Sequence, residues 1–214
     1  WEGQHPGECD RHKAVFNKFN AIPKYCFNCF KVCVKPRTVI EMLKVFFVFD
    51  KINLPNDNTR KCHIETREGI AGTYTGLVYC LGIEDAERVH AIIARVIKEN
   101  VSDEIPVTIK RGCSEYNIAY PGYADVSQGK TSMDYNSAWA EYEDIVDKDY
   151  IVDASKVSPE SHNKKGITLF DASVMLAFLR YAATIGDLSY LKITGNKPLE
   201  PFAEINRPPF QVVL

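Results

Sequence analysis

"FKVCVKPRTVIEMLKVFFVF", residues 30–49, is the stretch in which the hydrophobic pattern changes its period. Apolar side chains first alternate with lysines and a cysteine up to Pro36, a pattern typical of a half-buried strand. Thr38 is followed three residues later by a glutamate, a capping-box signature that predicts a helix beginning at Val39. The β-branched and aromatic run at the end would also suit a strand, but the apolar spacing favours a helix to about Phe49.

The same two periods recur further along the chain. We expect a second amphipathic helix that stops near Asn100. Three more strands are expected within residues 60–67, 77–81 and 105–113. The element order is then β-α-β-β-α-β across about residues 30–115, which is the ferredoxin-like split pattern. Two helices would cover one face of a four-stranded sheet and leave the other face open.

The whole chain is expected to be a mixed α+β protein in three parts. Residues 1–29 form an N-terminal zinc-knuckle segment, residues 30–122 form the ferredoxin-like domain, and residues 123–214 form a C-terminal extension. Within the extension, Asp171 is expected to cap one clear helix at about residues 172–185. The tail after this helix contains four prolines and is expected to be extended.

The composition is that of an ordinary globular protein. The 214 residues are 45% hydrophobic and 25% charged, and the net charge of −2 gives no whole-molecule reason to expect nucleic acid or an anionic membrane as partner. No apolar run reaches the roughly 18 residues that a membrane-spanning helix needs, so we expect no membrane contact. Seven cysteines are an odd number in a chain large enough to fold without disulfides, which favours a reducing compartment and hence the cytoplasm.

Two paired motifs in the first thirty residues have the spacing of metal ligands. Cys9-x-x-His12 and Cys26-x-x-Cys29 are separated by thirteen residues, and a two-residue spacer lets each pair converge on one ion. Such nitrogen and sulfur ligands are typical of structural zinc sites, so we predict Zn²⁺ as a cofactor held by all four side chains. Two alternatives stay open: the thiols are small buried apolar groups, or Cys26 and Cys29 are a redox pair, although Cys29 leads into a strand rather than a helix.

The open face of the predicted sheet carries Lys31, Lys61 and Arg67. The sequence leaves two registers open for the third and fourth strands: one adds Tyr79 and Lys110 to this face, and the other adds Val78, Cys80 and Arg111. A basic sheet with an aromatic is the surface on which RNA-binding domains stack bases. The topology resembles that of the RNA-recognition motif; of that family's third-strand signature, "TYTGLVYCL" keeps Gly76 and Tyr79 but lacks the basic residue and the second aromatic. The resemblance implies single-stranded RNA as a partner. In the alternative, residues 123–214 or a second subunit cover this face.

"KRGCSEY", residues 110–116, is the string most typical of an enzyme. Cys113 follows a glycine at a strand end and has two cations nearby, which would lower the pKa of a thiol. His63 could act as its base if the second and fourth strands bring the two residues together. The alternative is an ordinary thiol buried in a strand-terminating turn.

From these patterns we predict first a non-catalytic, zinc-stabilised module that binds a protein partner or assembles with itself, as one part of a longer protein. Single-stranded RNA binding through the open sheet face is the alternative. A cysteine-dependent enzyme that uses Cys113 is a further one, and the sequence leaves open whether the protein is an enzyme at all.

Overall fold

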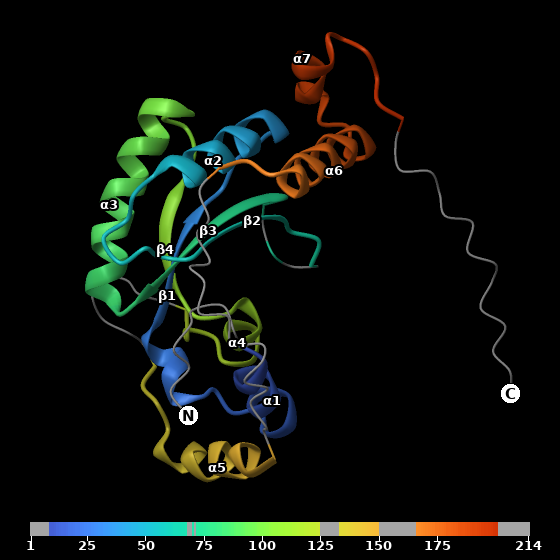
Figure 1. Cartoon of the computed structure of the whole chain (residues 1–214). Helices are drawn as coiled ribbons and strands as arrows, with labels where there is room; N and C mark the ends of the chain where they lie inside the picture. Colours follow the sequence, from blue (N-terminus) through green and yellow to red (C-terminus); the bar gives the residue numbers. More distant parts are fainter. Residues whose placement is uncertain (1–8, 68–69, 71, 125–132, 150–165, 201–214) are drawn as a thin grey trace, which may run out of the picture.

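A four-stranded antiparallel sheet in the order β2-β3-β1-β4 lies at the centre of the protein (Figure 1). The computed structural model describes residues 9–67, 70, 72–124, 133–149 and 166–200. The strands are β1 (Cys29–Val34), β2 (Arg60–Ile64), β3 (Tyr74–Leu81) and β4 (Val107–Arg111). The prediction of a mixed α+β protein with a four-stranded sheet is thereby confirmed.

Two helices cover one face of this sheet, α2 (Val39–Lys51) between β1 and β2, and α3 (Ile83–Asn100) between β3 and β4 (Figure 1). Helix α2 begins where the sequence predicts, because the Thr38 side chain accepts a hydrogen bond from the backbone N–H of Glu41. The main core lies between these helices and the sheet, and its fully buried members include Val32, Val34, Val45, Val78, Val89 and Ile93.

The register of the strands decides which side chains face away from the helices. Val32 of β1 lies opposite Val78 of β3, and both belong to the core under the helices. The preceding residue, Lys31, lies opposite Tyr79 on β3 and Lys110 on β4. Because successive side chains of a strand point to opposite faces, these three polar residues lie side by side on the open face.

A second group of helices lies at the end of the sheet where β1 begins (Figure 1). These helices are α1 (Asp10–Phe19), α4 (Ser114–Ala119) and α5 (Ala140–Asp149). The buried guanidinium of Arg11 donates hydrogen bonds to Glu143 at 2.6 Å and to Asp147 at 2.7 Å, which fixes α1 against α5. The buried cluster beneath them combines two segments that lie far apart in the sequence: Val15, Ala21, Ile22, Cys26, Tyr116, Tyr123, Trp139 and Val146. Segments that the sequence assigned to residues 1–29 and 123–214 therefore share one core.

The C-terminal part of the described chain forms α6 (Leu169–Ile185) and α7 (Leu191–Thr194). The expectation that Asp171 caps α6 is wrong, because the cap is Thr168, whose side chain accepts a hydrogen bond from the backbone N–H of Asp171. The Asp171 carboxylate accepts one in return from the Thr168 N–H, so the two residues form a capping box. The helix ends at Ile185, where the prediction placed its end, and Gly186 follows in the left-handed conformation.

Asp187 joins this C-terminal part to the sheet domain. Its carboxylate accepts hydrogen bonds from the backbone N–H of Val39 at 2.6 Å and from the hydroxyl of Tyr74 at 2.8 Å. Val39 is the first residue of α2, where a helix has no internal partner for its N–H. Asp187 thus supplies the hydrogen-bond partner that the start of α2 needs and holds β3 through the same carboxylate.

Most of the proline-rich tail lies beyond residue 200, and its predicted extended conformation falls outside the described residues. Among the helices that the structure describes, none combines the length and the apolar character needed to cross a membrane.

Candidate functional site

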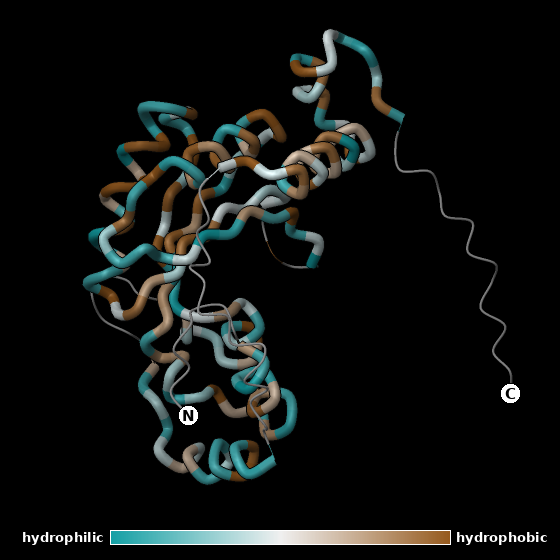
Figure 2. The backbone as a smooth tube through the Cα atoms, viewed as in Figure 1, coloured by the Kyte–Doolittle hydropathy of each residue, from teal (hydrophilic) through white to brown (hydrophobic). Residues whose placement is uncertain are grey.

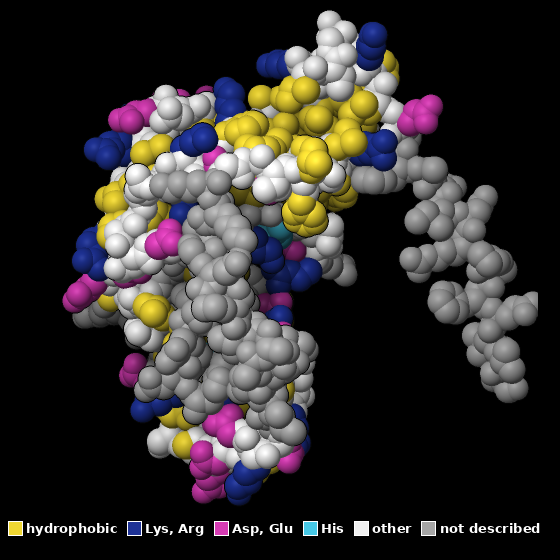
Figure 3. All heavy atoms as spheres, in the orientation of Figure 1, with side chains coloured by type: hydrophobic (Ala, Val, Ile, Leu, Met, Phe, Trp, Pro, Cys, Tyr) yellow, Lys and Arg dark blue, Asp and Glu magenta, His cyan; other side chains and the backbone are white. Residues whose placement is uncertain are grey.

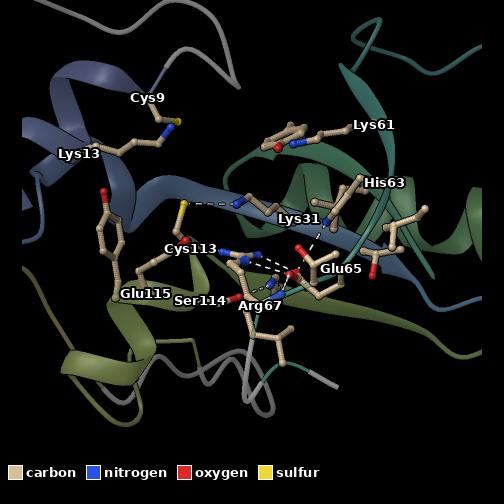
Figure 4. A pocket seen from close by; sticks show the side chains of 18 of the residues that line it. Cys9, Lys13, Lys31, Lys61, His63, Glu65, Arg67, Cys113, Ser114 and Glu115 are labelled. Carbon is tan, nitrogen blue, oxygen red and sulfur yellow. Dashed lines mark hydrogen bonds and ion pairs between the residues drawn. The ribbon is translucent and has the colours of Figure 1, made fainter. Parts of the chain in front are cut away.

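A pocket of about 610 Å³ lies on the open face of the sheet, where residues of α1 and α4 contribute to its lining (Figure 4). Side chains from all four strands line it as well. The carboxylates of this lining are Glu65 and Glu115. The lysines are more numerous: Lys13, Lys31, Lys35, Lys61 and Lys110. The pocket therefore carries a net positive charge on a protein whose total charge is −2.

Lys31 is the most deeply buried of these lysines, with 6% of its surface exposed. Its Nζ lies 5.2 Å from the centroid of the Tyr79 ring and donates a hydrogen bond to Sγ of Cys113 at 3.4 Å. Burial acts to lower the pKa of Lys31, but the negative charge that Cys113 and Tyr79 can carry outweighs it, and the pKa is raised above the usual value for lysine. The ammonium is therefore held in its charged form beside the thiol.

Two further lysines are positioned by hydroxyl groups. The Nζ of Lys110 donates to Oγ of Ser114 at 3.0 Å, and the Nζ of Lys35 donates to Oγ1 of Thr75 at 2.9 Å. Burial lowers the pKa of Lys110, and the positive charges of Lys31 and Lys35 lower it as well. An anion placed among these ammonium groups would relieve that repulsion, which makes this part of the pocket suited to negative charge.

Arg67 binds both carboxylates of the pocket. Its Nε and Nη2 donate to Glu65 at 2.9 and 2.7 Å, and its Nη1 donates to Glu115 (Figure 4). These bonds from Arg67 hold the pKa of Glu65 at about 2. The Nε2 of His63 lies 3.7 Å from the Glu65 carboxylate, and burial together with Lys61 lowers the pKa of His63, so the imidazole is neutral at pH 7. Both carboxylates of the pocket are thus paired with Arg67.

The position of Cys113 depends on the glycine before it. Gly112 has φ of +60°, and a Cβ at this residue would lie 2.1 Å from the hydroxyl oxygen of Tyr123. Tyr123 is fully buried, and its hydroxyl donates to the carbonyl of Cys26 at 2.6 Å, so the ring has no room to move aside. The N–H of Gly112 donates to the carbonyl of Cys29 at 2.8 Å. These contacts direct the chain from β4 into α4 and leave the sulfur of Cys113 facing the pocket (Figure 4).

The open-face residues that the sequence singled out all line this one pocket: Lys31, Lys61, Arg67, Tyr79 and Lys110. Arg67 is engaged by two carboxylates, so it is the least available of them for an incoming anion. Cys113 and His63 also line the pocket, but the residue in contact with the sulfur is Lys31, while His63 lies beside Glu65. Sequence reasoning missed this partner of Cys113. The expected split pattern already makes β1 and β4 neighbours, so it could have pointed to a residue of β1 as the partner of Cys113.

The four predicted zinc ligands also lie in described parts of the chain. His12, Cys26 and Cys29 are buried, and Cys9 is half-buried. The thiol of Cys26 donates to the hydroxyl oxygen of Tyr116 at 3.8 Å, and burial raises the pKa of Cys29 to about 11. Among the described residues, no group of three or more His, Cys, Asp or Glu side chains is placed to hold a metal ion. The Zn²⁺ site gains no support from this arrangement and stays a prediction.

Hydrophobic residues recur along α6 and the end of α2 (Figure 2). Exposed apolar side chains gather over these elements, on a different part of the surface (Figure 3). Leu169 is 90% exposed and Phe170 is 75% exposed, and Phe47 of α2 is also exposed. Such a surface is where a protein partner or a second copy would find apolar contact area. The predicted partner remains a prediction, and this surface shares no lining residue with the cationic pocket.

Comparisons of the chain with protein-family models, with curated proteins and with solved structures found no match. The chemistry of the site follows from its own residues. They are a convergent set of lysines, one thiol in contact with a buried ammonium, and one aromatic ring beneath that ammonium.

Proposed function

We propose that the pocket on the open sheet face binds a small anionic ligand of the class that carries a phosphate or similar multiply charged group. The convergence of five lysines in one hollow supports this proposal most strongly. A pocket of about 610 Å³ falls in the range of roughly 300–1,000 Å³ that is usual for small-molecule sites. Lys31 is already desolvated and fixed, so a bound anion would gain a strong charge–charge interaction without having to order that side chain.

A compact ligand suits the pocket better than an extended nucleic-acid strand. Base stacking needs an exposed aromatic face, and the ring of Tyr79 is occupied by the Lys31 ammonium. Residues of α1 and α4 also line the pocket, whereas a strand-binding platform runs openly across the sheet. We infer a ferredoxin-like topology for the sheet, supported by the order β2-β3-β1-β4 and by the helices α2 and α3 between the strands. RNA binding is the other result that the experiment below can distinguish.

The test is an equilibrium titration of the protein with pyrophosphate at low ionic strength. We expect saturable binding that Lys110→Met weakens by at least about tenfold, because it removes one charge-assisted hydrogen bond. Lys98→Met is the matched control, since Lys98 is an exposed lysine of α3 on the other side of the sheet, and it should leave the affinity unchanged.

A mixed-sequence single-stranded oligonucleotide is titrated in parallel. In one outcome the protein binds the oligonucleotide but not pyrophosphate, so that pyrophosphate does not displace the oligonucleotide. This result would favour RNA over a small ligand. Failure of both probes to bind at low salt would exclude an anion-binding role for this pocket.

A further inference from the structure

Cys113 differs from the other described thiols of the chain in its surroundings. Burial raises the pKa of Cys62 and Cys80 to about 12, which keeps these thiols protonated and unreactive. Cys113 is half-buried, lines the cationic pocket and accepts a hydrogen bond from a charged ammonium.

Lys31 is the second feature that supports a reactive role for the Cys113 thiol. It is a charged side chain that is more than nine-tenths buried and directed into the pocket, and a buried charge is costly unless it meets an opposite charge. Among the described residues, its hydrogen-bond partner is the sulfur of Cys113 rather than a carboxylate. The contact of this buried ammonium with the sulfur is an arrangement suited to a nucleophilic cysteine.

We propose that Cys113 is a nucleophile that forms a covalent bond with a small anion carrying an electrophilic carbon. The inference rests on the proposed function, because the lysines of the pocket would hold the anionic group while the sulfur attacks. Lys35, Lys61 and Lys110 line the same pocket of about 610 Å³ as the thiol.

The step balances without an added oxidant or reductant. The thiol proton passes to solvent, and the sulfur lone pair forms the new S–C bond. The leaving group departs from carbon with the electron pair of its own bond. Lys31 keeps its proton throughout and stabilises the thiolate by the hydrogen bond that it already makes.

Iodoacetate and iodoacetamide test this proposal, because both alkylate thiols by displacing iodide but only iodoacetate is an anion. The rates at Cys113 are measured by peptide mass spectrometry, and the iodoacetate-to-iodoacetamide ratio is compared with that of free glutathione. We expect the ratio at Cys113 to exceed that of glutathione by at least about tenfold, because a cationic pocket concentrates anions. Pyrophosphate should slow the reaction by occupying the same lysines.

Two variants separate charge from folding. Lys31→Met should bring the ratio close to that of glutathione, whereas Lys98→Met should leave it unchanged. Circular dichroism and thermal unfolding establish that each variant is folded. If Lys31→Met does not fold, the same ratio is measured for Lys110→Met. Lys110 lines the pocket and donates its hydrogen bond to Ser114.

A ratio at Cys113 equal to that of glutathione would overturn the inference, and so would a ratio that neither lysine variant lowers. The outcome is distinguishable from failure of the proposed function. Pyrophosphate binding with an unreactive Cys113 leaves the anion site intact and removes only the nucleophile. Absence of pyrophosphate binding removes the anion site whatever the thiol does.

Discussion

The ammonium of Lys31 lies 3.4 Å from the sulfur of Cys113, although 82 positions of sequence separate the two residues. The contact exists because β1 and β4 are neighbours in the sheet and because the turn after β4 directs Cys113 back over the open face. It places a charged group and a thiol together in a pocket that four other lysines and Arg67 also line. The proposed ligand binding and the proposed thiol chemistry both depend on this geometry.

Gly112→Ala tests whether the turn before Cys113 has an alternative conformation. The new Cβ would meet the hydroxyl of the fully buried Tyr123, and the residue would have to keep a positive φ. We expect a loss of on the order of 3 kcal/mol in the free energy of unfolding, measured by urea denaturation. Gly186→Ala is the control, since its φ is also positive but nothing lies within 4 Å of the added Cβ. Equal effects of the two substitutions would mean that backbone strain, not the contact with Tyr123, controls the turn.

The affinity for sulfate should fall as the pH rises. Sulfate keeps a constant charge between pH 7 and 10, so a change in affinity reports on the protein. Burial, together with Lys31 and Lys35, lowers the pKa of Lys110, so its ammonium loses its proton at a lower pH than an ordinary lysine with a pKa of about 10.4. Deprotonation removes one positive charge from the site, and we expect roughly a tenfold loss of affinity by pH 10. A titration of Lys110→Met should show a flatter profile, and an identical slope in both proteins would contradict this assignment.

Glu115→Gln should strengthen anion binding. The substitution removes one of the two carboxylates that line the pocket and leaves Arg67 with a single carboxylate partner, Glu65. We expect a gain of about two- to threefold in pyrophosphate affinity at low salt that shrinks as the ionic strength rises. Glu99→Gln, an exposed carboxylate at the end of α3, makes the same change in net charge away from the pocket. Equal gains for the two variants would show that only the total charge of the protein matters.

Asp187→Ala should loosen the C-terminal helices from the sheet domain. The carboxylate accepts hydrogen bonds from the first N–H of α2, at Val39, and from the hydroxyl of the buried Tyr74. Its removal leaves these two donors and the N–H of Ser189 without this partner, so we expect a loss of roughly 2–3 kcal/mol in the free energy of unfolding. Tyr74→Phe removes only one of the bonds and should cost about 1 kcal/mol. A negligible effect of Asp187→Ala would mean that α6 is held by its apolar contacts alone.

The sheet and its two covering helices were accessible from sequence because each element carries a local signal. The alternation in β1 predicts that Lys31 faces away from the helices, and the Thr38 cap predicts the start of α2. The sequence did not decide on which face of the sheet Tyr79 of β3 lies. The register decides it, because Val32 pairs with Val78 and places Tyr79 beside Lys31.

The walls of the pocket were not accessible in the same way. Helix α1 reaches the open face because Arg11 and an aromatic cluster join it to segments more than a hundred positions away, and no local pattern encodes that pairing. The partner of Cys113 depends on a positive φ at Gly112. The start of α6 was misplaced because Thr168 and Asp171 are both good capping residues, and only the hydrogen bonds assign them to the cap and to the third helical position.

The central claim is that the pocket lysines bind an anion, and NMR of the lysine side chains tests it most directly. Protein labelled with ¹³C and ¹⁵N at lysine is titrated with pyrophosphate, and the resonances of Cε and Nζ are assigned by single substitutions. We predict saturable shifts for Lys31, Lys35 and Lys110 with one common dissociation constant, while Lys98 stays unshifted. Shifts that are absent from the pocket lysines, or equal to those of Lys98 and proportional to the added anion, would contradict the account.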